Sequence, residues 1–301
     1  MTALRVGLVG AGPWASMFHA PVWSGGPETT LSGVWARRPE AARAVAEAHG
    51  ARAVTSFDEL LESSDAVAFC VPPDVQSGLA IRAAEAGRHL VLEKPIADTL
   101  RDARALADTC DAAGIGSLVM FTSRFSAETK SFLERAGSID VAGARAAMLT
   151  PAFLDGPFAQ SAWRRERGAL LDVGPHVFDL LTAAVGPIER VHARGTSRGW
   201  LGIHADHHGG AASDISISCS VGVQRGRFEI ELFGPAGAQR YDVDGGEPAQ
   251  VHATIRSALA AAADGRPHTC DVHRGLDIQH LIDAVERSMH EGRATLVSRA
   301  G

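Results

Sequence analysis

The stretch "VGLVGAGPWAS", Val6 to Ser16, decides the fold of the first half of the chain. A short apolar run of strand character leads into Gly10-x-Gly12-x-x-Ala15. Gly10 permits a tight turn, Gly12 allows the backbone to approach a pyrophosphate, and Ala15 is small enough for a helix to pack against the sheet. The free N–H groups and positive end of that helix favour phosphate groups. The spacing therefore predicts a dinucleotide site directly after the first strand.

The residues around this stretch alternate between strand and helix patterns. Expected strands, each short and apolar, are Leu4–Val9, Leu31–Ala36, Asp65–Val71, His89–Glu93 and Ser117–Phe121. Helical segments of ordinary length separate most of them, and Pro or Gly stands at several of the expected helix ends. Strands that alternate with helices in this way predict a parallel sheet covered on both faces. We expect a doubly wound Rossmann domain over residues 1–122.

The alternation stops after residue 122. Strand-like runs, interrupted by Gly and Pro, now dominate and lie at Ala144–Thr150, Ile188–Gly195, Ser213–Gly222 and Gly226–Gly234. Helical patterns stand at both ends of this half. It is therefore expected to form an α+β domain, residues 123–301, with an open and mostly antiparallel sheet. The fold class of the whole chain is α/β.

The amino-acid composition limits the classes of binding partner that we expect for this protein. A net charge of -6 and a pI near 6.1 give no reason to expect nucleic acid or an anionic membrane as partner. No apolar run approaches the roughly 20 residues that span a bilayer. Four cysteines stand far apart without a CxxC pair, which predicts a reducing, cytoplasmic setting. The histidines of "HADHH", 204–208, read as part of a glycine-rich turn without a third spaced ligand, so no metal site is expected.

The end of the second expected strand bears on the cofactor. NAD enzymes usually place Asp or Glu there to accept from the ribose hydroxyls. This chain has Ala36, Arg37 and Arg38 instead. Two guanidinium groups can hold a 2′-phosphate by charge-assisted hydrogen bonds, which favours NADP, with NAD still possible. The alternative is that both arginines are simply solvated at a helix start.

A second informative stretch is "VLEKPI", Val91 to Ile96, in which a buried run ends in Glu93 and Lys94. Ligands of doubly wound sheets bind beyond the carboxyl ends of the strands. The two charges are therefore expected to face a ligand, although a surface turn would also explain them.

The third stretch is "RGALLDVGPHVFDLL", Arg167 to Leu181. Asp172 and His176 are four residues apart, so in a helix they lie on the same face. An Asp beside a His can orient the imidazole and stabilise its charged form, which suits a proton shuttle near neutral pH. Asp172 could equally be the N-cap of the helix, with Pro175 in its first turn.

With both halves in view, the chain resembles the glucose–fructose oxidoreductase, inositol dehydrogenase and rhizopine-catabolism family (Gfo/Idh/MocA). The resemblance rests on "GAGPWA", "VPP" at 71–73, "GRHLVLEKPIA", "SRF" at 123–125 and "GALLDVGPH". It implies a Rossmann domain, a sheet domain that often dimerises, and substrates that are sugars, cyclitols or related polyols. A homodimer or homotetramer through the C-terminal sheet is expected on this basis.

The resemblance also implies roles for residues. Lys94 would contact the reacting hydroxyl, Pro95 would be cis, and Glu93 would steady the loop and the cofactor. His176 would be the general acid/base, with Asp172 as its orienter and a substrate ligand. Further cofactor contacts would come from Pro13, Trp14 and Pro72, and a further substrate contact from Arg124.

The chain departs from the family pattern at two places. Ser123 stands where many members carry Asn, and Gly168 is all that remains of a longer glycine run. These departures put the substrate in doubt more than the cofactor. Besides a net oxidoreductase, two other functions stay open. One is a nucleotide-binding regulator without turnover, and the other is a lyase or glycosidase that oxidises its substrate only transiently.

Overall fold

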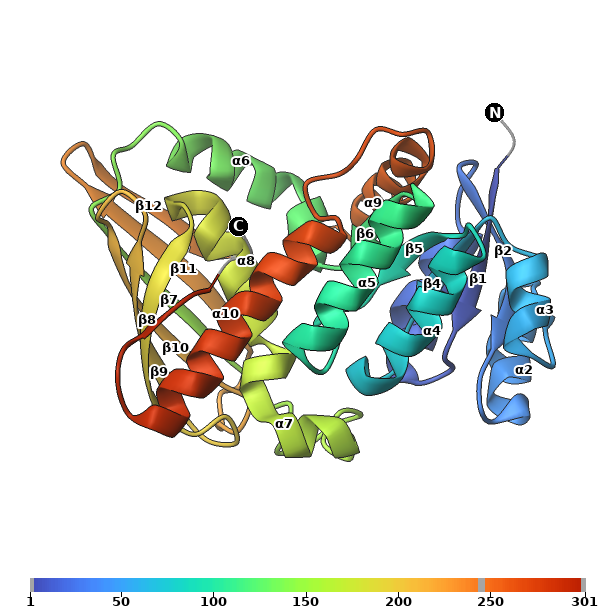
Figure 1. The fold of residues 1–301 in the computed structure, drawn as a ribbon, viewed down its shortest axis with the longest axis horizontal. Coiled ribbons are helices and arrows are strands. Elements are labelled where there is room, and N and C mark those ends of the chain that lie inside the picture. The colour runs from blue at the N-terminus through green and yellow to red at the C-terminus, as the bar shows by residue number, and fades with distance from the viewer. Residues whose placement is uncertain (1–2, 243–246, 299–301) are drawn as a thin grey trace. The chain divides into compact units, whose positions relative to one another are not determined.

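The computed structural model describes residues 3–242 and 247–298, which form two compact units (Figure 1). One unit holds the described residues through Met120 together with Glu247–Leu276. The other holds the described residues from Phe121 up to the gap and those from Asp277 onward. Each unit has its own sheet, so each is treated by itself.

The first unit is built on a six-stranded parallel sheet. Its strands are β1 (Leu4–Val9), β2 (Thr29–Trp35), β3 (Arg52–Ala53), β4 (Ala66–Phe69), β5 (His89–Leu92) and β6 (Ser117–Val119). Their order is β3-β2-β1-β4-β5-β6, and every neighbouring pair is parallel. The direction of winding reverses between β1 and β4, and such a switch point is where doubly wound sheets bind nucleotides. The predicted Rossmann domain is confirmed; only the two-residue edge strand β3 was not expected.

Helices cover both faces of this sheet. They are η1 (Ala15–His19), α1 (Ala20–Ser24), α2 (Pro39–Ala48), α3 (Phe57–Glu62), α4 (Pro73–Glu85), α5 (Leu100–Ala113) and α9 (Pro248–Ala263). Among these helices, α1 packs against α9, and α4 packs against α5. The side chains of Ser56 and Thr99 cap α3 and α5 by accepting from backbone N–H groups at 3.1 and 3.2 Å.

Helix α9 joins the first unit, although the sequence placed all residues after 122 in the second domain. Arg256 on α9 is buried, pairs with Glu28 at 3.0 Å and donates to the carbonyl oxygen of Val22 at 3.3 Å. A buried guanidinium needs such partners, so this contact fixes α9 to the N-terminal fold. The next helix, α10 (Val272–Glu291), contains the division between the units.

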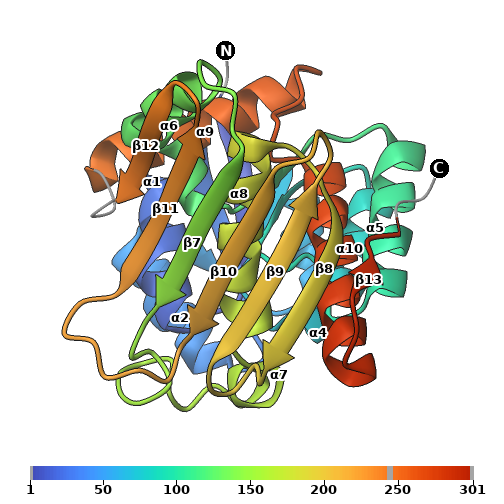
Figure 2. The same cartoon turned by 90° about the vertical axis from the view of Figure 1, so that its left-hand side faces the viewer.

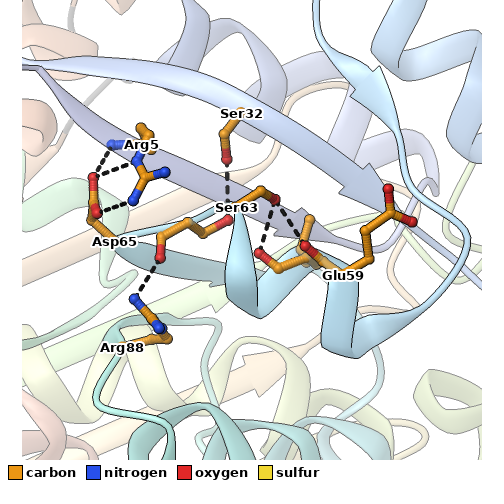
Figure 3. A network of polar contacts seen from close by, with 8 residues as sticks. Arg5, Ser32, Glu59, Ser63, Asp65 and Arg88 are labelled. Carbon is orange, nitrogen blue, oxygen red and sulfur yellow. Dashed lines mark hydrogen bonds and ion pairs between the residues drawn. The ribbon is translucent and has the colours of Figure 1, made fainter.

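A polar network ties the amino ends of the strands together (Figure 3). Arg5 holds Asp65 through Nη2 at 2.6 Å and Nε at 3.1 Å, and these bonds lower the pKa of the Asp65 carboxyl. Ser64 contacts the Ser32 hydroxyl at 3.1 Å, and its carbonyl accepts from Arg88 at 3.0 Å. This edge is opposite to the one where ligands bind, so the network is structural.

The second unit contains a seven-stranded mixed sheet. Its strands are β7 (Gly143–Leu149), β8 (Ile188–Gly195), β9 (Leu201–His207), β10 (Ala212–Ser218), β11 (Arg227–Gly234), β12 (Gly237–Asp242) and β13 (Thr295–Leu296). The order is β12-β11-β7-β10-β9-β8-β13, and only β7 and β10 pair in parallel. The predicted mostly antiparallel sheet is confirmed. The expected turn at 204–207 is wrong, because these residues belong to strand β9.

Helices back this sheet on one face. They are η2 (Thr122–Phe125), α6 (Ala127–Ala136), α7 (Ala162–Asp172) and α8 (Gly174–Val185). Figure 2 views the sheet face-on, with α8 behind it. Alternate residues of β9, such as Leu201, Ile203 and Ala205, are buried, as the period of two in a strand requires.

One helical stretch among the described residues, Ala162–Val185, is long and apolar enough by length and composition to cross a membrane. The sequence analysis expected none. Gly168 interrupts the stretch with a φ of 73°, and 78% of its most apolar window is buried inside the structure. The stretch therefore packs as a core helix of the second unit.

Candidate functional site

The glycine-rich turn after β1 has the geometry that a dinucleotide requires. Gly10 has a φ of 114°, and a Cβ there would collide with the carbonyl oxygen of Cys70. A Cβ on Gly12 would meet nothing within 4 Å, so the backbone there is open to an approaching phosphate. Ala15 is fully buried under the following helix. The residues present therefore fit a pyrophosphate at this turn.

Trp14 links this turn to the loop after β5. Its indole N–H donates to Oε1 of Glu93 at 2.7 Å, and its ring stacks on Phe18 with centroids 4.6 Å apart. Trp14 and Glu93 belong to separate sequence motifs, and both were expected to contact the cofactor. The structure brings these two residues together within the first unit.

His19 is a second donor to Glu93, and the sequence analysis did not single it out. Trp23 donates to Nδ1 of His19 at 3.4 Å, so this nitrogen carries the lone pair. The other nitrogen, Nε2, then carries the proton that it donates to Glu93 over 2.8 Å. His19 is fully buried, so its ring orientation is fixed by packing and by both bonds.

The carboxyl of Glu93 stays ionised despite its location. Burial alone would raise its pKa, but the hydrogen bond from His19, the charge of Lys94 and the hydrogen bond from Trp14 together lower the pKa below its usual value. The loop therefore presents a fixed negative charge beside the glycine-rich turn.

Gln76 on α4 is a further residue that the sequence analysis missed. It is fully buried, and its amide Nε2 donates to the carbonyl oxygens of Glu93, Pro95 and Ile96 at 2.8 to 3.2 Å. Its Oε1 accepts from the backbone N–H of Glu93 at 2.9 Å. One side chain thus bonds backbone groups of three of the four loop residues. A polar residue in an otherwise apolar helix face was the only signal for it in the sequence.

The remaining predicted residues of the first unit lie at the carboxyl edge of its sheet. Lys94 follows β5 and is half-buried, and the Lys94–Pro95 peptide is cis, as the resemblance implied. Pro72 follows β4 as the N-cap of α4. Arg37 and Arg38 follow β2, are exposed, and form no ion pair with a residue that the structure describes.

The predicted residues of the second unit gather around α7 and α8. The N–H of Val173 donates to the carbonyl oxygen of Ala169 at 2.9 Å at the end of α7, and α8 begins at Gly174, directly after Val173. Asp172 is therefore the last residue of α7, and His176 lies in the first turn of α8, so the two residues belong to different helices. The alternative in which Asp172 is the N-cap is wrong, because the chain is already helical at Ala169.

Asp172 has a partner that the sequence did not reveal. It is 7% exposed, and its Oδ1 accepts from Nε of Arg164 at 3.0 Å. Arg124, a predicted substrate contact, donates from Nη1 to both carboxylate oxygens of the buried Asp179 at 2.9 and 3.0 Å. This bond gives Arg124 a structural partner within its own unit.

Two other ionisable side chains in this unit are buried and hydrogen-bonded within the protein. His207 is buried, bonded to the Gly186 carbonyl at 2.7 Å and the Ser213 hydroxyl at 2.6 Å, and burial lowers its pKa. Tyr241 is buried against Phe132 and bonded to Thr129 at 3.0 Å, and burial raises its pKa. Across the described ranges, no group of three or more His, Cys, Asp or Glu residues could hold a metal ion.

Known proteins resemble the chain in sequence. A 3-reductase for dTDP-3,4-didehydro-2,6-dideoxy-α-D-glucose from Streptomyces violaceoruber is 30% identical over 193 residues, which is 63% of this chain and 56% of the reductase. A D-glucoside 3-dehydrogenase from Escherichia coli is 30% identical over 61% of this chain and 54% of the enzyme. The chain spans about half the length of these curated relatives.

Solved structures resemble the chain over nearly its whole length. An oxidoreductase domain protein from Kribbella flavida has a TM-score of 0.88 and 25% identity, covering 99% of this chain and 100% of its own. GenD2 from gentamicin A biosynthesis, solved in complex with NAD, has a TM-score of 0.87 and 22% identity, covering 100% and 97%. At this identity, GenD2 shows that the fold is shared.

The family model matches the part of the chain that carries the glycine-rich turn and the loop after β5. It is the oxidoreductase family with an NAD-binding Rossmann fold, and the match covers residues 4–121. The match agrees with the resemblance noted in the sequence: residues 4–121 are similar to the Gfo/Idh/MocA oxidoreductase family.

Proposed function

We propose that the protein is an NAD(P)-dependent oxidoreductase that moves hydride to or from a carbinol or carbonyl carbon of a sugar, cyclitol or related small polyol. The observation that carries the proposal is the bond between Trp14 and Glu93, because it joins the glycine-rich turn to the loop that bears Lys94. A nucleotide held at the turn would have an ammonium group beside it. The named substrates of the two curated relatives, a nucleotide-linked deoxysugar and a glucoside, support the substrate class.

Each residue has a proposed part. Gly10, Gly12, Pro13, Trp14, Ala15, Pro72, Glu93 and Lys94 would hold the cofactor, which supplies or accepts hydride when bound. Lys94 would hold the reacting hydroxyl and share its proton, and His176 would act as general acid/base with Asp172 beside it. Arg124 would hold a further part of the substrate.

We also propose that NADP is preferred. Arg37 and Arg38 stand where an acid would accept from the ribose, and both are exposed without an ion pair to a described residue. Their guanidinium groups are therefore available for a 2′-phosphate. A cytoplasmic location and a homodimer or homotetramer through the second unit's sheet complete the proposal.

Fluorescence titration with NADPH and NADH tests the cofactor choice. The wild type should bind NADPH more tightly, and the double variant Arg37→Ala/Arg38→Ala should lose that preference while keeping its NADH affinity. Arg101→Ala, at an exposed arginine on α5, is the matched control. Equal or tighter NADH binding by the wild type would remove the NADP assignment but leave the oxidoreductase proposal intact.

A further inference from the structure

Asp172 and Arg164 form a partly buried ion pair that the sequence pattern does not predict. The side chains are 10% and 20% exposed, and Nε of Arg164 lies 3.0 Å from Oδ1 of Asp172. Hydrogen bonds between ionised partners are stronger than neutral ones, and partial burial reduces their screening by solvent. The orientation of this carboxylate is therefore set in part by the guanidinium.

The contact exists because the helix is broken. In an unbroken α-helix, residues eight apart are separated by about 12 Å along the axis, too far for this bond. Gly168 has a φ of 73° and a ψ of -165°, which ends the first helical segment and lets the chain turn back. The N–H of Ala169, the residue after the break, donates to the Ser197 carbonyl at 2.6 Å and starts the next segment.

Arg164 is itself held in place by two aromatic rings. Its guanidinium carbon lies 4.8 Å from the ring centroid of Phe158 and 4.5 Å from that of Trp163. Nη1 also donates to the Ser161 hydroxyl at 3.4 Å. Cation–π contacts of this kind suit the flat guanidinium far better than a lysine ammonium. The stacking leaves little freedom for the Nε–H that Asp172 accepts.

We propose that Arg164 is a positioning residue for the reaction: it fixes the orientation of the Asp172 carboxylate next to His176. This inference rests on the proposed function for its catalytic consequence. Arg164 need not touch the substrate. Its effect passes through the carboxylate, so removing Asp172 should remove the effect of Arg164 as well.

A double-mutant cycle with chemical rescue tests the proposal. Arg164→Ala should lower kcat/KM about 100-fold, the scale expected when a reacting group is misplaced by about 1 Å. Added ethylguanidine at millimolar concentration should restore part of that loss. The double variant Arg164→Ala/Asp172→Asn should be no slower than Asp172→Asn alone, because both changes remove the same orientation. Cofactor affinity should stay unchanged in Arg164→Ala.

The matched control is Arg167→Ala on the same helix, where Arg167 pairs with Glu286 at 2.9 Å. It should keep wild-type kcat/KM and show no response to ethylguanidine. Arg164→Lys, a second variant, keeps the positive charge but loses the planar guanidinium and its stacking on the aromatic rings. Its kcat/KM should therefore stay as low as that of Arg164→Ala. Fully additive losses in the cycle, or wild-type turnover in Arg164→Ala, would overturn the proposal while leaving the oxidoreductase assignment in place.

If the wild type itself turns over no substrate, the proposed function fails. The free energy of unfolding of each variant in the same cycle is then measured in urea. A loss of stability in the double variant that is smaller than the sum of the single losses supports the pairing of Arg164 with Asp172. Additive losses would overturn it. The two failures are therefore distinguishable.

Discussion

At the scale of single residues, the buried amide of Gln76 organises the loop that carries Lys94. It makes hydrogen bonds with Glu93, Pro95 and Ile96. Replacement by Leu leaves these backbone groups unpaired, at about 1–3 kcal/mol for each group that cannot reach water. Gln76→Leu should lower the free energy of unfolding by at least about 2 kcal/mol and weaken cofactor binding.

Urea unfolding and NADPH titration check this prediction. Gln224→Leu, at an exposed position in the second unit, is the control and should change neither quantity. A Gln76→Leu protein with wild-type cofactor affinity would show that the loop holds its shape without the amide.

Lys94 and His176 carry the proposed proton handling. Lys94→Ala and His176→Ala should each lower kcat by roughly 100-fold or more, as losses of acid/base groups do. Steady-state kinetics with the best substrate check this. Lys130→Ala, at an exposed lysine on α6, is the control for loss of an ammonium group. Wild-type turnover in either variant would remove the role assigned to that residue.

Residues that belong to a short sequence motif could be predicted from the sequence. Residues whose hydrogen-bond partner is distant in sequence could not. The glycine-rich turn follows from a motif of a few residues, and the cis Lys94–Pro95 peptide was implied by the family resemblance. Gln76 and Arg164 do not follow from such a motif, because their partners are 17 to 20 and eight positions away and meet them only after the chain turns back. His19 was missed for the same reason.

At the scale of elements, the break at Gly168 shapes the second unit's site. A Cβ there would collide with the carbonyl group of Ser197, and the backbone lies in a region that is almost restricted to glycine. Gly168→Ala should therefore cost about 1–3 kcal/mol of stability and reduce kcat/KM through the displaced Arg164.

Thermal unfolding and kinetics check this prediction. Gly137→Ala is the control, since Gly137 ends α6 with a φ of -66° and the nearest atom to a Cβ there lies 3.6 Å away. Equal stability of Gly168→Ala and the wild type would mean that the break does not depend on glycine.

Elements with strong local signals were predicted well. Ser56 and Thr99 cap α3 and α5, and Gly114 ends α5 with a φ of 61°. Strand β9 was missed, because its histidines and acid conceal a period-two pattern in which only alternate positions are buried. The placement of α9 in the first unit depends on the ion pair between Arg256 and Glu28, which are 228 positions apart.

At the scale of the whole molecule, the buried His207 and the half-buried His89 and His252 contribute to the pH dependence of stability in mild acid. Burial lowers the pKa of His89, His207 and His252. The folded state therefore keeps them neutral at a pH where the unfolded chain, with a pKa near 6.5, takes up protons. Because the unfolded state binds more protons there, the free energy of unfolding should fall as the pH drops from about 7 through 6.5 toward the folded pKa values.

Urea unfolding at a series of pH values checks this prediction. The variant His207→Gln can still donate to the Gly186 carbonyl. Its free energy of unfolding should fall less over this pH range than that of the wild type. Stability that stays constant or rises over this range would contradict the neutral state of these imidazoles.

Net hydride transfer to or from a sugar-like carbon defines the proposed oxidoreductase, and deuterium labelling measures this transfer. Sugars, cyclitols and polyols are first screened with NADP⁺ and NAD⁺ for the reduced nicotinamide band. A hit, deuterated at its carbinol carbon, is then followed by mass spectrometry. We expect deuterium on the cofactor and one equivalent of keto product. Conversion of a substrate without net reduced cofactor, or binding of the nucleotide without turnover of any compound, would contradict it.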